Sequence, residues 1–201
     1  MHIGIIDYQA SNLGSLSSAL RELQISFFVS SNPADFNNVD LILLPGVGSF
    51  KSGMMNLEAY GLDKTIIKHA SLGKPILGIC LGMHLLSSVG YEGGIHQGLN
   101  LIPGKVLKLQ QNNNFRVPHM GWDVIQGNEK KEYVYFAHSF FFSPEEQTQT
   151  TILSHFQSGD SLLPAQIKLG NISGIQFHPE KSGPAGLQIM KETLEDLMSN
   201  H

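Results

Sequence analysis

Three short apolar runs, each close to a polar or turn residue, constrain the fold of this chain more than any other feature. They are Ile3–Ile6, Leu41–Leu44 and Ile76–Ile79. Runs of this length that are apolar throughout are typical of strands buried on both faces, as in a parallel sheet. Pro45-Gly46 ends the second run and Gly73–Pro75 precedes the third, so turn residues separate the strands from what lies between them.

Segments of helical periodicity lie between and after these runs. After the first run, with Ser11 or Asn12 as a candidate cap, leucines recur at helical spacing at Leu13, Leu16, Leu20 and Leu23. We expect further helices over Leu57–His69, Leu81–Val89 and Ala185–Met198. Strands that alternate with helices predict parallel units in the first half of the chain.

The residue pattern changes from about Lys105 onward. Short β-like segments follow one another there, at Val106–Leu109, Val134–Ala137, Thr151–Ser154, Ala165–Lys168 and Ile172–Phe177. We expect these strands to pair in a more antiparallel way, with the aromatic residues Trp122 and Phe140–Phe142 in the core. The predicted fold is α/β, with a central mixed, mostly parallel sheet flanked by helices and a strand-rich second half.

Length and composition narrow the functional classes. A chain of 201 residues with a formal net charge of −4 predicts a single domain over residues 1–201 and no nucleic-acid partner. The single cysteine, Cys80, excludes an internal disulfide and a multi-thiolate zinc site. Without an export signal or about 20 consecutive apolar residues, we expect a cytoplasmic protein with no membrane contact. His2, His119 and His138 lack convincing ligand spacing, so we expect no metal and no cofactor.

The segment around Cys80 has the pattern of a reactive site. An apolar run leads into Gly78-Ile79-Cys80-Leu81-Gly82 and then into a segment of helical periodicity. This is the pattern of a nucleophile elbow, a sharp strand-to-helix turn that projects a nucleophile while flanking glycines relieve crowding. A thiol near a helix N-terminus has a lowered pKa, because the helix dipole favours the thiolate. The alternative is that Cys80 is simply a small buried residue.

A second segment contains the partners that a thiol nucleophile needs. Phe177-His178-Pro179-Glu180 follows an apolar strand. An imidazole can accept the thiol proton and return it to a leaving amine, and His178 fits this role. A carboxylate that orients the imidazole and stabilises its charged form completes a triad, and Glu180 fits this one. The spacing alone does not distinguish the pair from surface residues, since the chain has nine histidines.

A thioester mechanism also requires donors for an oxyanion. The backbone N–H of Leu81, directly after the nucleophile, is one candidate. Pro45-Gly46-Val47-Gly48 follows a predicted strand, and its glycines could direct a second N–H toward the site. The alternative for this loop is an ordinary turn at the end of a strand.

Together these motifs resemble the class I, triad-type glutamine amidotransferases, and among them the glutaminase subunits of imidazole glycerol phosphate synthase. The resemblance spans nearly the whole chain, and its specific marks are Ile6-Asp7-Tyr8 with Asn12-Leu13, Pro118–Trp122, His138-Ser139-Phe140 and Gln176–Ser182. It implies an α/β fold and hydrolysis of L-glutamine through a glutamyl thioester. It also implies a heterodimer in which ammonia passes through a tunnel to a (β/α)₈ synthase subunit, for histidine biosynthesis.

The resemblance further implies a role for each matching residue. Cys80 is then the nucleophile, His178 the general base and acid, and Glu180 the orienting carboxylate. The positions that match the oxyanion loop and the substrate-binding segments are Gly46, Val47, Gly48, Leu81, His84, His138, Ser139 and Phe140. The positions that match the face toward the synthase partner are Asn12, Tyr135 and Lys181.

Two departures from the family pattern affect these expectations. The family usually has glutamine four residues after the nucleophile, where this chain has His84. An imidazole differs from an amide in reach and charge, so we expect weaker glutamine binding. The segment Tyr8–Asn12 lacks the glycines that the family more often carries there, which bears on the identity of the partner.

Other functions remain open on the sequence. A paralogous amidotransferase could deliver ammonia to a different synthase, such as one that amidinates a sugar. A catalytically idle subunit could only bind and regulate a synthase, which the intact Cys80, His178 and Glu180 disfavour and His84 keeps open. A cysteine peptidase or another acyl hydrolase could use the same elbow, although the match at Pro118–Trp122 disfavours it.

Overall fold

Strands and helices alternate along the first half of the chain in the computed structural model, which describes residues 2–113, 115–127 and 130–199. The first half contains β1 (Ile3–Ile6), α1 (Leu13–Glu22), β2 (Phe27–Ser30), the 3₁₀ helix η1 (Pro33–Phe36), β3 (Leu41–Leu44), α2 (Phe50–Tyr60), α3 (Leu62–Ser71), β4 (Ile76–Ile79) and α4 (Leu81–Leu85). The three predicted apolar runs are β1, β3 and β4, and every residue in them is buried.

The second half is rich in strands, as predicted. It contains β5 (Val89–Gly90), β6 (His96–Gln97), β7 (Gly104–Lys108), β8 (His119–Gly127), β9 (Lys131–His138), β10 (Phe140–Pro144), β11 (Thr151–Ser158), β12 (Ser161–Leu169), β13 (Ile172–Ile175), the 3₁₀ helix η2 (Pro179–Lys181) and α5 (Gly183–Ser199). The predicted closing helix over Ala185–Met198 is confirmed as part of α5.

One mixed sheet joins both halves. Its nine strands have the order β2-β1-β3-β4-β13-β12-β11-β8-β9, and a four-stranded sheet has the order β10-β7-β5-β6. The pairings from β2 to β13 are parallel and those from β13 to β9 are antiparallel. The mixed α/β class is therefore confirmed, with the parallel part confined to the β2–β13 side. Because β13 pairs in parallel with β4, the carboxyl ends of these two strands lie next to each other.

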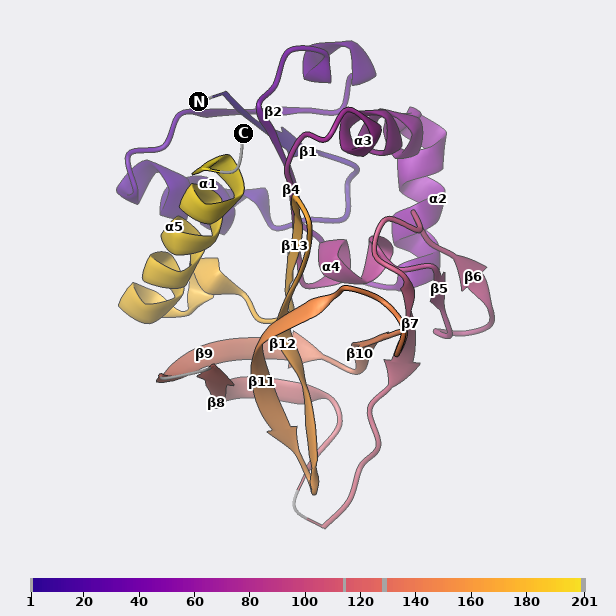
Figure 1. Ribbon diagram of the computed structural model, residues 1–201, viewed down its shortest axis with the longest axis vertical. Coiled ribbons are helices and arrows are strands. Elements are labelled where there is room, and N and C mark those ends of the chain that lie inside the picture. Colours follow the sequence, from indigo (N-terminus) through magenta and orange to yellow (C-terminus); the bar gives the residue numbers. More distant parts are fainter. Residues whose placement is uncertain (1, 114, 128–129, 200–201) are drawn as a thin grey trace.

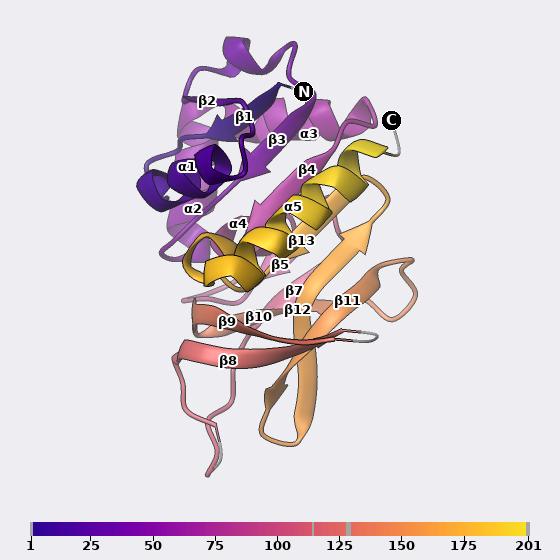
Figure 2. The ribbon, with the colours of Figure 1, turned by 90° about the vertical axis from the view of Figure 1, so that its left-hand side faces the viewer.

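Helices cover both faces of the parallel part. In Figures 1 and 2, α1 and α5 lie on one face of the sheet, whereas α2, α3 and α4 lie on the other in Figure 1. Leu16 and Leu20 of α1 pack with Met190 of α5 in one apolar core. Phe50 of α2 and Ile66 of α3 belong to a second core on the opposite face. Burial of these apolar faces is the main driving force that places the helices.

Two helix predictions are wrong in their extent. The expected helix over Leu57–His69 is two helices, because Gly61 adopts a left-handed conformation with φ of 68° that ends α2 and precedes α3. The expected helix over Leu81–Val89 ends at Leu85, and Val89 instead pairs in β5. In the first case, a single glycine interrupts the helix although the apolar periodicity continues through it.

The sequence reasoning also missed strands and misplaced one aromatic residue. Strand β2 pairs with β1 at the edge of the sheet, and the expected strands did not include it although Phe27, Phe28 and Val29 form a short apolar run. Trp122 on β8 is 58% exposed, so its assignment to the core is wrong. Phe142 on β10 is fully buried as expected.

Candidate active site

Cys80 lies at a strained turn between β4 and α4. Its backbone has φ of 53° and ψ of −110°, a region that residues with a side chain rarely occupy. Its N–H donates to the carbonyl oxygen of Ile175 at 2.7 Å, which ties the turn to β13. This is the backbone geometry of a nucleophile elbow, and strain of this kind is typical of functional sites.

Close backbone approach explains the two glycines of the elbow. A Cβ atom on Gly82 would lie 1.7 Å from the carbonyl oxygen of Leu44, and one on Gly78 would lie 2.8 Å from the backbone of Gly82. Helix α4 can therefore start directly beside β3 and β4 only where both positions lack a side chain. The Gly-x-Cys-x-Gly pattern is thus a steric requirement of the turn.

His178 and Glu180 meet Cys80 at the adjacent strand end. His178 follows β13, and Nδ1 of His178 lies 2.8 Å from Oε1 of Glu180, with both side chains at most 5% exposed. The His178 imidazole also forms a hydrogen bond with the Cys80 side chain. The structure therefore brings together the three residues that the sequence singled out.

The charge balance of this group favours a protonated imidazole. Burial lowers the pKa of His178, but the hydrogen bonds and negative charges of Cys80 and Glu180 outweigh it and raise the pKa to about 10. The His178 backbone is held as well, because its N–H donates to the carbonyl oxygen of Tyr135 at 2.9 Å and its own carbonyl oxygen accepts from Ser182 Oγ at 2.6 Å. An imidazole held between a cysteine and a glutamate side chain is suited to proton transfer.

Both candidate oxyanion donors are engaged in other hydrogen bonds in this conformation. The Leu81 N–H donates to the carbonyl oxygen of Gly46 at 3.3 Å. The Val47 N–H donates to the carbonyl oxygen of Ala10 at 2.6 Å. The expectation that these groups face a substrate oxyanion is therefore not met here, although both residues lie beside Cys80.

A cavity of about 410 Å³ opens over Cys80. The predicted residues that line it are Val47, Gly48, Cys80, Leu81, His84, His138, Ser139, Phe140, His178 and Lys181. Gly46 does not line this cavity but is enclosed behind it, since a Cβ atom there would lie 2.1 Å from Tyr8 Oη and 2.9 Å from Leu81. The volume is in the range of small-molecule sites.

The sequence reasoning missed several residues of this cavity. Glu92 lines it, and its Oε2 accepts a hydrogen bond from the Phe50 N–H at 2.7 Å, at the start of α2. Glu92 lies in the loop between β5 and β6 and belongs to no motif, so no local signal could have identified it. Pro118, Met120 and Ala137 also line the cavity.

His84 is buried in the wall of the cavity. Its Nε2 lies 2.7 Å from Oε1 of Gln176. Burial lowers the pKa of His84 to about 4, more than the hydrogen bond with Gln176 raises it. His84 is therefore neutral near pH 7, and since Gln176 Oε1 can only accept, the His84 hydrogen is on Nε2.

The residues expected to face a partner do not form one cluster. Nζ of Lys181 lies over the Tyr135 ring, 5.9 Å from its centroid, at the edge of the Cys80 cavity. Asn12 lies at the start of α1 and lines a separate open cavity together with Glu180. Their role toward a partner stays a prediction.

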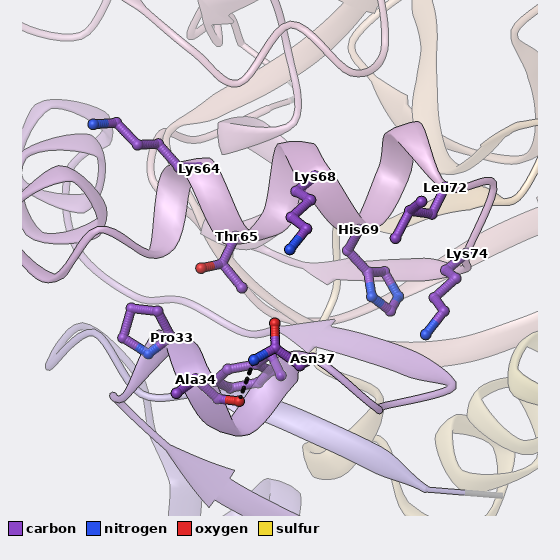
Figure 3. A pocket seen from close by; sticks show the side chains of 10 residues that line it. Pro33, Ala34, Asn37, Lys64, Thr65, Lys68, His69, Leu72 and Lys74 are labelled. Atoms are coloured by element: carbon purple, nitrogen blue, oxygen red, sulfur yellow. Dashed lines mark hydrogen bonds between the residues drawn. The ribbon is translucent and has the colours of Figure 1, made fainter.

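Another cavity, of about 330 Å³, lies between η1 and α3 and contains no predicted site residue (Figure 3). Its side chains include Lys64, Lys68 and Lys74. Among the described residues, no group of three or more His, Cys, Asp or Glu side chains is arranged to hold a metal ion. None of the helices in residues 2–113, 115–127 and 130–199 is long and apolar enough to cross a bilayer.

Comparisons with known proteins show the family of this chain. The family model "Glutamine amidotransferase class-I" matches residues 4–197. The chain is 41% identical to the imidazole glycerol phosphate synthase subunit HisH of Carboxydothermus hydrogenoformans, over 96% of this chain and 98% of that protein. It is 44% identical to the subunit of the same name from Listeria monocytogenes, over 94% of this chain and 93% of that protein.

Solved structures show the same fold at low sequence identity. A crystal structure of a glutamine amidotransferase has a TM-score of 0.79 at 17% identity, with 98% of each chain covered. A glutamine amidotransferase from Thermotoga maritima has a TM-score of 0.64 at 18% identity, covering 98% of this chain and 84% of that one. Because the family model matches residues 4–197, almost the whole chain, the chain belongs to the class I glutamine amidotransferases.

Proposed function

We propose that this chain is the glutaminase subunit of an imidazole glycerol phosphate synthase, folded as one domain over residues 1–201. It hydrolyses L-glutamine to L-glutamate and ammonia, and the ammonia passes to a (β/α)₈ synthase subunit. The observation that carries the chemistry is the contact series from Cys80 through His178 to Glu180 at one end of a cavity of about 410 Å³. The relatives named HisH support the pathway.

His178 transfers a proton in each of the two halves of the proposed reaction. The Cys80 thiolate attacks the side-chain carboxamide carbon of glutamine and forms a tetrahedral oxyanion. His178 then gives its proton to the nitrogen, the C–N bond breaks, and ammonia leaves a glutamyl thioester. Water attacks the thioester while His178 takes its proton, and the C–S bond breaks to release glutamate and the Cys80 thiolate. Glu180 stabilises the imidazolium at both stages.

One peptide unit controls both candidate oxyanion donors. The carbonyl of Gly46 and the N–H of Val47 belong to the same peptide, and they bind Leu81 and Ala10, respectively. Rotation of this peptide would free the Leu81 N–H and turn the Val47 N–H toward the site. Gly48, directly after Val47, has φ of 103°, a backbone conformation that glycine adopts readily.

This peptide gives the proposed enzyme a means of control by its partner. Without a free oxyanion donor, we expect slow hydrolysis in the conformation described here. A partner that favours the rotated peptide would raise the rate by shifting the population of the two conformations. Hydrolysis by the isolated chain at the full rate of the complex would contradict this part of the proposal.

An apolar face beside the cavity supports the partner assignment. Met120 and Trp122 project from the same face of β8, because alternate residues of a strand share a face. Trp122 pairs with Tyr135 of β9, and Tyr133 lies two residues along that strand. Met120, Trp122 and Tyr133 are each more than half exposed. A large exposed apolar surface next to an active site is typical of a protein interface.

The test is glutamate release by the purified chain, alone and with the barrel subunit of an imidazole glycerol phosphate synthase plus the nucleotide substrate of that enzyme. We expect release that depends on Cys80 and rises with that partner, with Cys80→Ala as the inactive control. Release that responds only to a different synthase would favour a paralogous amidotransferase. No release under any of these conditions would contradict the proposal and favour an idle regulatory subunit.

A further inference from the structure

Three contacts connect Asp123, His119 and His138 to the backbone of the cavity wall. Oδ2 of Asp123 lies 2.9 Å from Nε2 of His119, and Nδ1 of His119 lies 3.1 Å from Nε2 of His138. Nδ1 of His138 lies 2.7 Å from the carbonyl oxygen of Phe140. The side chains of Asp123, His119 and His138 are called the histidine relay below. The proposed hydrolysis mechanism uses none of them.

The relay ends at residues that touch the substrate space. His138, Ser139 and Phe140 all line the cavity over Cys80. The Ser139–Phe140 segment is also held by β7, which pairs with β10 from Phe140 onward, and by Leu109 directly after β7, whose N–H donates to the carbonyl oxygen of Ser139 at 2.9 Å. The His138 side chain adds a contact to the Phe140 carbonyl oxygen, and its other ring nitrogen contacts His119.

The two imidazoles are enclosed, whereas the carboxylate is open to solvent. His119 packs against the rings of Phe115, Phe136 and Phe156, with centroid distances from 4.4 to 5.1 Å. Its side chain is 9% exposed, and that of Asp123 is 40% exposed. The other oxygen of Asp123, Oδ1, accepts from the Val124 N–H at 2.7 Å. The carboxylate is thereby held in place facing His119.

Counting hydrogens shows that the three contacts require an additional proton. A carbonyl only accepts, so Nδ1 of His138 carries a hydrogen, and Nε2 of a neutral His138 must then accept from His119. A carboxylate also only accepts, so Nε2 of His119 must carry a hydrogen as well. Two neutral rings hold two hydrogens for three contacts. All three are hydrogen bonds only when one ring is an imidazolium.

The surrounding charges favour a proton on His119 over one on His138. Asp123 lies beside His119, and its hydrogen bond and charge raise the pKa of His119, while burial lowers that pKa more strongly. The charged or titratable groups that act on His138 are His119, His84 and His178. Each of these disfavours a charge on His138, and burial lowers its pKa well below the ordinary value. The third proton therefore binds to His119 on the acid side of the ordinary histidine value of 6.5.

We propose that the histidine relay is a proton-dependent positioning device for the Ser139–Phe140 wall of the glutamine cavity, an inference that rests on the proposed glutaminase function. With the proton on His119, the wall is held through three hydrogen bonds. After the proton leaves, two acceptors face each other at one contact. The contact with the carboxylate is charge-assisted and is retained, so the lost hydrogen bond is at His138 or at the Phe140 carbonyl.

The direct test is an NMR titration of the full chain labelled with ¹⁵N, from about pH 5 to pH 8, the range in which histidines titrate. We expect the His119 ring to change from imidazolium to imidazole, while His138 stays neutral. The amide resonances of Ser139 and Phe140 should move with the His119 midpoint. A His119 ring that is neutral throughout, with unchanged wall resonances, would overturn the proposal.

Asp123→Asn is the matched variant, because it keeps the shape and removes the need for the proton. The amide N–H of asparagine can donate to Nε2 of a neutral His119, so all three contacts are satisfied by two neutral rings. We expect the His119 midpoint and the movement of the Ser139 and Phe140 resonances to disappear. An Asp123→Asn protein whose wall resonances titrate like those of the unmodified chain would contradict the relay.

Glutamine affinity gives the functional readout. In a Cys80→Ala background, which prevents turnover, calorimetry should show the Kd for L-glutamine rising about fivefold across the His119 midpoint, the value of one net hydrogen bond. With Asp123→Asn added, the change in Kd across the His119 midpoint should disappear. Any effect of His178 is common to both proteins and cancels in the comparison. Failure of every variant to bind glutamine would count against the glutaminase function, whereas the ring and wall resonances decide the relay independently.

Discussion

Replacing Gly82 by alanine tests the geometry of the elbow directly. A Cβ atom at this position would lie 1.7 Å from the carbonyl oxygen of Leu44 and 2.7 Å from its carbon, whereas Cβ atoms do not approach other heavy atoms within 3.0 Å. The start of α4 would have to move about 1.3 Å away from β3. Leu44 is fully buried backbone in the centre of the sheet, so it cannot yield as a flexible side chain would.

This movement should cost both stability and activity. Forced overpacking of a buried contact destabilises a protein by about 1–3 kcal/mol or more. Cys80 precedes α4 by one residue, and a displacement of about 1 Å at a reacting group can reduce the rate by about 100-fold. We therefore expect Gly82→Ala to lower the midpoint of guanidinium unfolding and to lower kcat for glutamine hydrolysis in the complex by at least that factor.

Gly14→Ala is the control for the effect of alanine itself. Gly14 is exposed in α1, and the nearest atom to its Cβ position is 3.9 Å away. Alanine should stabilise the helix there by up to about 1 kcal/mol. If Gly82→Ala unfolded at the same denaturant concentration as the parent chain and kept its kcat, the steric account of the elbow would be refuted.

Three further substitutions have distinct expected effects. Glu180→Gln should lower kcat by roughly 10²- to 10⁴-fold with little change in KM, because the carboxylate acts mainly on the imidazolium; an unchanged kcat in steady-state assays would remove Glu180 from the triad. His84→Gln should lower the glutamine KM by about threefold or more through an added hydrogen bond to substrate. The folded-state pKa of His84, about 4, lies below the unfolded value of 6.5, so this group stabilises the fold above pH 6.5 and the stability is lost as pH falls to 4. His84→Gln should recover about 3 kcal/mol of unfolding free energy at pH 4, measured by denaturant titration at several pH values. Trp122→Ala should leave stability unchanged, since the side chain is exposed, and should weaken binding of the synthase subunit by about tenfold or more in calorimetry.

Local patterns in the sequence predicted the strands that carry the site. A run of four apolar residues bounded by turn residues is typical of a strand buried on both faces, so Leu41–Leu44 and Ile76–Ile79 were identified without any tertiary information. The helix boundaries were less predictable. Apolar periodicity continues through Gly61, and only the backbone conformation of that residue separates α2 from α3.

The catalytic group was predictable for a similar reason. Cys80 is surrounded by glycines that the turn requires, and His178 and Glu180 lie two residues apart at a strand end. Glu92 was not assigned to the site, because it lies in a distant loop with no motif of its own. His119 lies in the Pro118–Trp122 motif, but that motif gave no role to its side chain. Trp122 was misplaced because an aromatic residue in a strand gives no information about which face of the sheet is covered.

The sequence by itself indicated the fold class and the elbow through short-range sterics, and the order of its motifs, with the family resemblance they carry, selected the residues proposed for catalysis. Only the tertiary structure decided that Leu81 and Val47 have no free N–H, that His84 meets Gln176, and that Asp123 is linked to the cavity through two histidines. Each of these depends on hydrogen bonds between segments far apart in the chain. Such contacts follow from how the strands pair and pack, which local patterns do not encode.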